Sequence, residues 1–220
     1  AMEPVHDGAH DHATAPPTTV CRAAGPQSPR DISDAAGENP DMFERAPPSS
    51  EMNLCNLHFH KGAEHKSPAA SNGYDRPALA SAGYKGGHRC RMDATPAELK
   101  PVALSEAAAG CEGVAPGDTI EVHWVFSTCN VAPGAGLGSC VLKDQTCKLR
   151  VESQVFLLVN DGTAPTFNAY DYSGAPPLGA RHQPRGLPVS RVAPVEYRGS
   201  TTNEAYNSVN ACSPIEVSWR

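Results

Sequence analysis

Three of the chain's nine histidines lie in the segment 53–65, and two of them, His58 and His60, are separated by a single residue. Side chains two apart on a β-strand project to the same face, so these two imidazoles would point one way while Leu57 and Phe59 point the other. Two imidazoles on one side of a rigid strand form half of a metal site. Such a pair also occurs by chance in ordinary strands, where the alternative is two solvated histidines at a sheet edge.

A downstream segment, 118–125, offers a third ligand because it also alternates as a strand. Apolar residues at positions 120, 122 and 124 share one face, and the opposite face holds Glu121, His123 and Val125. Three neutral imidazoles with an open position for water are typical of a catalytic zinc site, and a carboxylate beside a ligand histidine usually orients it. We therefore predict that His58, His60 and His123 bind Zn2+. Glu121 would accept the N–H of His123 and fix its tautomer.

Several separated motifs resemble the carbonic anhydrases, and specifically the delta class, whose ligand pattern parallels that of the alpha class. The segment 58–60 (His-Phe-His) resembles the first two zinc ligands, the pair Glu64-His65 resembles the Glu-His pair that follows them, and 121–124 (Glu-Val-His-Trp) resembles the strand with the third ligand. The segment 25–29 is similar to the Gln-Ser-Pro segment near the start of the alpha-class domain. The segment 197–202 (Tyr-Arg-Gly-Ser-Thr-Thr) is similar to that class's Tyr-Pro-Gly-Ser-Leu-Thr-Thr.

This resemblance implies a carbonic anhydrase, a zinc-dependent lyase that reversibly hydrates CO2 to bicarbonate and a proton. A zinc-bound hydroxide would attack CO2, because zinc lowers the pKa of its bound water to about 7, a value known from carbonic anhydrase itself. Thr201 resembles the residue whose hydroxyl accepts the proton of that hydroxide, and Glu64 resembles the carboxylate that orients this threonine. Val125 is the best-placed candidate for the small apolar pocket that receives CO2.

The chain departs from the alpha-class pattern in three places. The leucine between the serine and the two threonines is missing, so Thr202 is an alternative to Thr201. Glu152 falls where an apolar wall of the pocket is expected. The segment 27–58 is shorter than in the alpha class, so the proton-shuttle histidine of that class is not carried over. Buffer would then take the proton directly, unless one of three other histidines serves as shuttle: His65, His88 and His182.

Composition narrows the possible partners. The chain has 220 residues, enough for one domain that buries about 70% of its unfolded surface. Its net charge is −6, and no basic stripe or aromatic ladder follows the sequence, so we expect no nucleic-acid partner. No apolar run is long enough to predict a transmembrane segment. The implied partner is the small-molecule substrate, CO2 or bicarbonate, and the oligomeric state is left open.

Eight cysteines indicate an oxidising compartment, since the reducing cytosol rarely tolerates disulfides. No two of them form a Cys-x-x-Cys pair, which favours a disulfide framework over a zinc finger. We therefore expect a secreted or periplasmic protein. The start, Ala1-Met2, is typical of processing, so we expect that a signal peptide has been removed.

The pairing of these cysteines is only partly constrained. The alpha-class resemblance implies a bridge between Cys21, before the Gln-Ser-Pro segment, and Cys212, after the two threonines. Proximity in the sequence suggests a bridge between Cys90 and Cys111. A further bridge would lie within the group Cys129, Cys140 and Cys147.

Proline (21 residues) and glycine (19 residues) favour many turns and short strands over long helices. We predict a mostly β domain of the α+β type with few short helices, built on a central, largely antiparallel sheet with long loops, as in the alpha carbonic anhydrases. This domain spans 21–220 and follows a loose, polar N-terminal arm, 1–20. Strands are predicted at 52–61, 118–125, 149–160 and 215–219. The stretch 155–159 is apolar on both faces, which predicts full burial, and the best helix candidate is 95–110.

Two other functions are compatible with the sequence. The first is a non-catalytic, carbonic-anhydrase-like secreted protein that binds metal or acts as a scaffold. The second is a secreted protein that binds metal through the N-terminal arm, which holds His6, His10 and His12. The second leaves the strand histidines unexplained, and a solvated arm is the favoured interpretation of these three residues.

Overall fold

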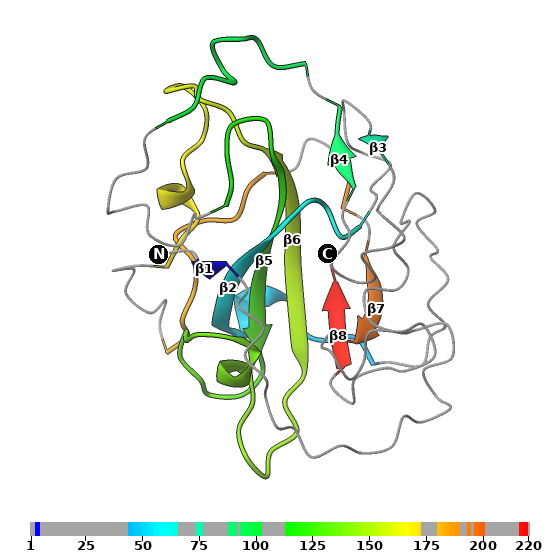
Figure 1. Cartoon of the computed structure of the whole chain (residues 1–220). Coiled ribbons are helices and arrows are strands. Elements are labelled where there is room, and N and C mark those ends of the chain that lie inside the picture. The colour runs from blue at the N-terminus through cyan, green and yellow to red at the C-terminus, as the bar shows by residue number, and fades with distance from the viewer. Residues whose placement is uncertain are drawn as a thin grey trace.

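Long β-strands form the centre of this computed structural model, which describes residues 3–4, 44–65, 74–76, 88–91, 93–102, 113–172, 180–189, 193–194, 196–200 and 216–219. A six-stranded sheet has the strand order β1-β2-β5-β6-β8-β7 (Figure 1). Its strands are β1 (Glu3–Pro4), β2 (Asn53–Lys61), β5 (Thr119–Ser127), β6 (Leu149–Leu157), β7 (Tyr197–Ser200) and β8 (Glu216–Trp219). A second sheet pairs β3 (Tyr74–Arg76) with β4 (Arg89–Cys90).

The middle of the large sheet is antiparallel. Strands β2, β5 and β6 have nine residues each, and β5 pairs antiparallel with both of its neighbours. The pairs β1–β2 and β6–β8 are parallel, whereas β7–β8 is antiparallel. In the described residues the helical elements are three 3-10 turns: Ser49–Glu51, Leu137–Cys140 and Phe167–Ala169. These observations confirm the predicted mostly β domain with a largely antiparallel central sheet.

Alternation along β2 and β5 separates the two faces of the sheet as predicted. One face carries an apolar cluster whose strand residues are Leu54, Leu57, Phe59, Ile120, Val122, Trp124 and Phe126. On the opposite face a smaller cluster comprises Cys55, Val125, Cys129, Val131, Cys140, Leu149 and Val151. The three histidines of β2 and β5 lie on this second face, beside the smaller cluster. The larger cluster therefore supports the strands from behind while polar side chains occupy the other face.

A β-bulge interrupts the pairing of β2 with β5. Leu54 and Asn56 lie opposite consecutive residues of β5, so Cys55 is the extra residue. Bulges change the direction of side chains locally. Here Cys55 packs in the cluster with Val125, and Asn56 contacts His58, so two consecutive side chains reach the same face.

The prediction that 155–159 is fully buried is wrong. These residues are half-buried, whereas 149–152 at the other end of β6 are buried. In the described part of the chain, β8 pairs with β6 only along 149–151, so the far half of β6 has a strand on one side only. Apolar character on both faces is therefore a poor guide to burial where a neighbouring strand is short.

The helix predicted from residue 95 does not form over 95–102, where the chain makes a turn. The Thr95 hydroxyl donates to the Glu98 carboxylate over 2.6 Å, and the Glu98 amide donates back to that hydroxyl over 3.3 Å. Pro101 follows within a few residues, and a proline disfavours helical backbone at the residue before it. The rest of the predicted helix, 103–112, lies outside the described residues.

Two disulfides tie the segment 129–147 together and to the sheet. The bridge Cys129–Cys147 falls within the predicted group, which confirms that prediction. The bridge Cys55–Cys140 joins Cys140 to a residue for which the sequence suggests no partner. The other predicted bridges involve residues outside the described part of the chain: Cys21, Cys111 and Cys212.

Of the predicted arm 1–20, the structure describes only Glu3 and Pro4, which pair in parallel with His58 and Phe59 of β2. The rest of the arm lies outside the described residues. Among the helices of the described residues, none has the length and apolar character needed to cross a membrane.

Candidate metal centre

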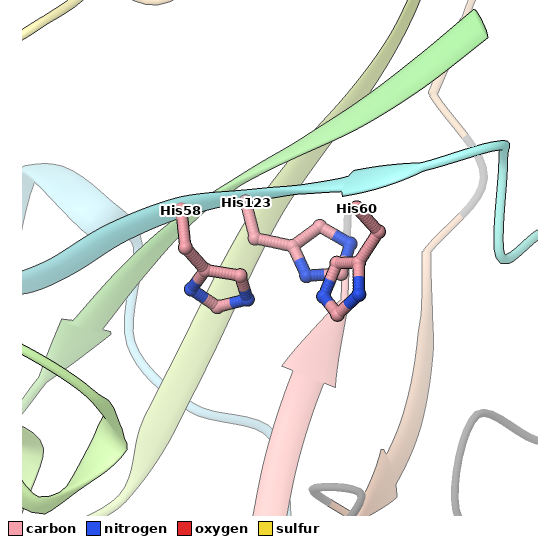
Figure 2. Close-up of side chains that lie close together, drawn as sticks. All are labelled: His58, His60 and His123. Atoms are coloured by element: carbon pink, nitrogen blue, oxygen red, sulfur yellow. The ribbon is translucent and has the colours of Figure 1, made fainter. Parts of the chain in front are cut away.

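Three imidazoles converge beside the central strands. His58 and His60 project from β2, and His123 projects from the neighbouring β5 (Figure 2). Their ring centroids are 4.8–5.1 Å apart, and one ring nitrogen from each lies within 4.8 Å of the other two. His58 and His123 are buried, whereas 27% of the His60 side chain is exposed. Solvent therefore reaches the cluster from the side of His60.

Strand register brings these three residues together. His58 lies directly opposite His123, and His60 lies opposite Glu121. Residues opposite each other on antiparallel strands have side chains close enough to interact, and residues two apart share a face. The spacing His-x-His on one strand and Glu-x-His on the next therefore produces a cluster of four side chains when the strands pair in this register.

The two histidines of β2 each have one ring nitrogen against a polar oxygen. Nδ1 of His58 contacts Oδ1 of Asn56, and Nδ1 of His60 lies 3.0 Å from Oε1 of Glu64. Because these oxygens accept hydrogen bonds, they favour the neutral tautomer with the proton on Nδ1. Nε2 of both rings is then the nitrogen that could bind a metal.

His123 is oriented in the opposite sense by a buried carboxylate. Its Nε2 lies 2.8 Å from Oε1 of Glu121. The same oxygen accepts from the Ser153 hydroxyl over 2.9 Å and from Nδ1 of His65 over 2.8 Å, and the His65 amide donates to Oε2 over 3.0 Å. With its proton on Nε2, His123 presents Nδ1 as the ligand nitrogen.

Burial and charge keep the histidine neutral and the carboxylates ionised. Burial lowers the pKa of His58 well below its ordinary value, and His60 and His123 lower it further. Burial would raise the pKa of Glu121, but attraction to His65 and hydrogen bonds from His123 and His65 hold that pKa well below its usual range. Burial likewise opposes ionisation of Glu64, and attraction and a hydrogen bond from His60 lower its pKa. Neutral imidazole is the form that binds a metal.

The donor set fits Zn2+. Zinc is bound in proteins by imidazole, thiolate and carboxylate, whereas Ca2+ and Mg2+ prefer oxygen ligands. A cluster of three imidazoles, each with a partner on its other ring nitrogen, matches the first preference. In addition, the buried carboxylates of Glu64 and Glu121 place two negative charges beside the cluster, which offset the charge of a divalent cation.

The structure places the remaining predicted site residues in different surroundings. Val125 lies on the same face as His123 and is 1% exposed. Glu152 does not lie where an apolar wall was expected, because it pairs in register with Trp124 on the opposite face and forms a 2.8 Å ion pair with Arg150. On the side of the histidines, β6 instead contributes Val151, Ser153 and Val155, which lie opposite Val125, His123 and Glu121.

Glu64 contacts Nδ1 of His60, and the structure does not test the threonine partner that the resemblance implies for it. Thr201 and Thr202 lie outside the described residues, so the structure says nothing of them. Of the shuttle candidates, His65 is buried against Glu121, and His88 is buried and forms backbone hydrogen bonds with Ala63. Neither of these two is placed to carry protons to bulk solvent, whereas His182 is half-buried at the far end of β2.

Sequence reasoning misses two residues of this centre. Asn56 lies two residues before His58, so the same spacing argument that pairs His58 with His60 could have found it. Ser153 lies opposite His123 in the register of β6, which no short motif reveals.

The sequence was compared with curated proteins, solved structures and protein-family models. Neither the curated proteins nor the solved structures gave a match. The sequence model of the delta carbonic anhydrases matches residues 49–220, which include the three histidines and their partners. Because this match covers well over half of the 220 residues, the chain belongs to the delta carbonic anhydrase family.

Proposed function

We propose that this protein catalyses the reversible hydration of CO2 to bicarbonate and a proton, with Zn2+ held by His58, His60 and His123. The observation that carries the proposal is the convergence of three imidazoles, each of which has a ring nitrogen within 4.8 Å of a ring nitrogen of the other two. Family membership supports carbonic anhydrase activity in general. When bound, zinc supplies a nucleophile near neutral pH by lowering the pKa of a coordinated water, as is known for carbonic anhydrase itself.

The protein's own contribution is to hold each ligand in one tautomer and orientation. Asn56, Glu64 and Glu121 each contact one ring nitrogen of a clustered histidine, which leaves the other ring nitrogen to bind the metal. This arrangement makes the site preorganised, so little free energy is lost in ordering the ligands when the metal binds. The two carboxylates also favour a cation over a neutral or anionic ligand at this position.

The part of the site that receives CO2 would be apolar where it borders the sheet. Val125 and its neighbour Val151 lie on the face of the histidines and exclude water there. CO2 is apolar and bicarbonate is charged, so an apolar wall favours entry of the substrate and release of the product. We assign to Thr201, or to Thr202, the hydroxyl that orients the nucleophile, on the strength of the resemblance in 197–202.

The two disulfides support a location where cysteines are oxidised. We therefore propose a secreted or periplasmic protein. Detection of the disulfide-bonded form in a secreted or periplasmic fraction, and of no such form in the cytosol, would test this location.

The experiment for the activity combines zinc analysis with CO2 hydration kinetics on the purified chain. We expect about one zinc per chain and hydration that is lost in the double variant His58→Ala/His60→Ala, which removes two of the ligands. His182→Ala is the matched control for zinc content, because His182 is not among the clustered histidines. Full zinc content in the double variant would show that another part of the chain holds the metal. Zinc binding without hydration would instead favour a non-catalytic metal-binding protein.

A further inference from the structure

We propose that the loop between Cys129 and Cys147 is a positioning element of the metal centre, acting on His58 through the side chain of Asn56. The inference rests on the proposed metal centre for its functional meaning. Its structural basis is a chain of hydrogen bonds that begins on the loop and ends on the imidazole.

The first link fixes the orientation of the Asn56 amide. Nδ2 of Asn56 donates to the carbonyl of Gly134 over 3.0 Å. A backbone carbonyl can only accept, so the amide nitrogen must face Gly134 and the amide oxygen must face the other way. That oxygen contacts Nδ1 of His58, which must therefore donate. The loop carbonyl thus determines which nitrogen of His58 carries the proton.

The second link holds Gly134 over β2. The Gly134 amide donates to the carbonyl of Cys55 over 3.0 Å, and the Ser139 hydroxyl donates to the same carbonyl over 2.5 Å. Cys55 is the extra residue of the bulge. A Cβ on Gly134 would lie 3.1 Å from Cβ of Ser139, a tight contact that Ser139 would have to shift by a few tenths of an ångström to relieve.

Two covalent links keep the loop in this place. Cys140, directly after Ser139, is bonded to Cys55, the residue before Asn56 on the strand. Cys129 and Cys147 close the two ends of the loop, and Nδ2 of Asn53 donates to the carbonyl of Cys129 over 3.0 Å. Both cysteines of the Cys55–Cys140 bridge are fully buried. The carbonyl of Gly134 is thereby held within reach of Asn56.

Loosening the loop has a specific consequence for the metal ligand. Without the Gly134 carbonyl, the Asn56 amide can rotate by half a turn and present Nδ2 to His58. A donor at that position favours the tautomer with the proton on Nε2, the nitrogen that the metal needs. The disulfide Cys55–Cys140 is then required for tight metal binding. A dithiol would reduce this bridge by transferring two electrons and two protons to the sulfurs of Cys55 and Cys140, and the dithiol would itself become a disulfide. This reduction would weaken metal binding.

The experiment measures the tautomer of His58 and the affinity for zinc separately. Nitrogen-15 NMR of the zinc-free full chain should show His58 with its proton on Nδ1. In Asn56→Ala and in Cys55→Ala/Cys140→Ala, a mixture of tautomers should appear, and zinc affinity in a chelator competition should fall about 10–100-fold. Asn56→Asp should keep the Nδ1 proton, because a carboxylate oxygen accepts from it as the amide oxygen does.

Asn53→Ala is the matched control. It removes another β2 asparagine that is hydrogen-bonded to the same loop, but its side chain contacts the Cys129 carbonyl and the His182 backbone amide rather than His58. With both disulfides intact, the tautomer of His58 should therefore not change. A folded double cysteine variant with the tautomer and zinc affinity of the wild type would overturn the proposal. If that variant does not fold, Asn56→Ala decides, since an unchanged tautomer there also overturns it. Should the wild type bind no zinc, the tautomer measurements still test the positioning role while the proposed function fails.

Discussion

Glu121 and His123 lie two residues apart on β5, and Oε1 of Glu121 lies 2.8 Å from Nε2 of His123. The carboxylate that holds this imidazole is itself held by three other donors, two from His65 and one from Ser153. Glu121, His123 and His65 are buried. The orientation of His123 is therefore fixed by side chains in the interior of the protein. The position of the Glu121 carboxylate is in turn fixed by residues outside β5.

Replacing Glu121 by alanine should weaken zinc binding about 10–100-fold, because the three imidazoles stay in place but His123 loses the group that fixes its tautomer. Hydration activity should persist at saturating zinc. Competition with a chromophoric chelator measures the affinity. Ser153→Ala is the control, since it removes one donor to the carboxylate and leaves the carboxylate itself, and its effect should be smaller. Equal affinity of Glu121→Ala and wild type would contradict the role of this residue.

Replacing Thr201 by alanine should leave the zinc content full while CO2 hydration falls about 10²–10³-fold, the usual loss for a positioned hydrogen-bonding group at a transition state. Thr202→Ala is the matched comparison. If Thr202→Ala is the inactive variant and Thr201→Ala is active, the hydroxyl belongs to Thr202. Stopped-flow hydration with parallel zinc analysis separates these results, and full activity of both variants would show that the mechanism uses neither hydroxyl.

Glu196 should make stability depend on pH in the acidic range. Burial would raise its pKa, but hydrogen bonds from Arg45 and Arg150 and their charges lower it. Because the pKa of Glu196 is lower in the folded state, its ionised carboxylate stabilises the fold at pH values above its pKa in the unfolded chain, about 4.3. This stabilisation is lost as the pH falls through the pKa of Glu196 in the folded protein.

The variant Glu196→Gln should therefore be less stable than the wild type at pH 7, by about 1 kcal/mol or less because the side chain of its partner Arg45 is 67% exposed. The gap should close at a pH below the folded pKa of Glu196, where the wild-type carboxyl is protonated and resembles the amide. Thermal or urea unfolding at both pH values gives the comparison. A gap of the same size at both values would show that packing, rather than charge, accounts for the difference.

The sequence predicts the clustering of the three histidines because that clustering depends on local spacing. His58, His60 and His123 follow from the alternation of two strands, and alternation also separates Ile120, Val122 and Trp124 onto the opposite face. Burial of the apolar face of each strand excludes a register shifted by one residue, since such a shift would expose that face.

What the sequence does not predict depends on contacts between distant segments. The bulge at Cys55 carries no glycine or proline, so nothing local marks it. Its disulfide with Cys140 spans 85 positions and follows from where the loop crosses the strand. The role of Glu64 beside His60 likewise depends on how the chain turns after β2. Half-burial of 155–159 depends on the length of β8, a strand far along the chain.

Disulfide mapping by mass spectrometry of the non-reduced protein should find the bridges Cys55–Cys140 and Cys129–Cys147. It should also link Cys21 to Cys212, as the alpha-class resemblance implies. Reduction should lower the free energy of unfolding by about 2–5 kcal/mol for each structural bridge lost, because a cross-link restricts the unfolded chain.

The two bridges should differ in how fast they are reduced. Cys55 and Cys140 are fully buried, whereas Cys147 is half-buried, so mild reductant should open Cys129–Cys147 first. Timed alkylation followed by peptide mapping gives the order. Faster loss of Cys55–Cys140 would mean that the loop over β2 opens readily in solution. Reaction of all eight thiols in the native, untreated protein would remove the main support for an oxidising compartment.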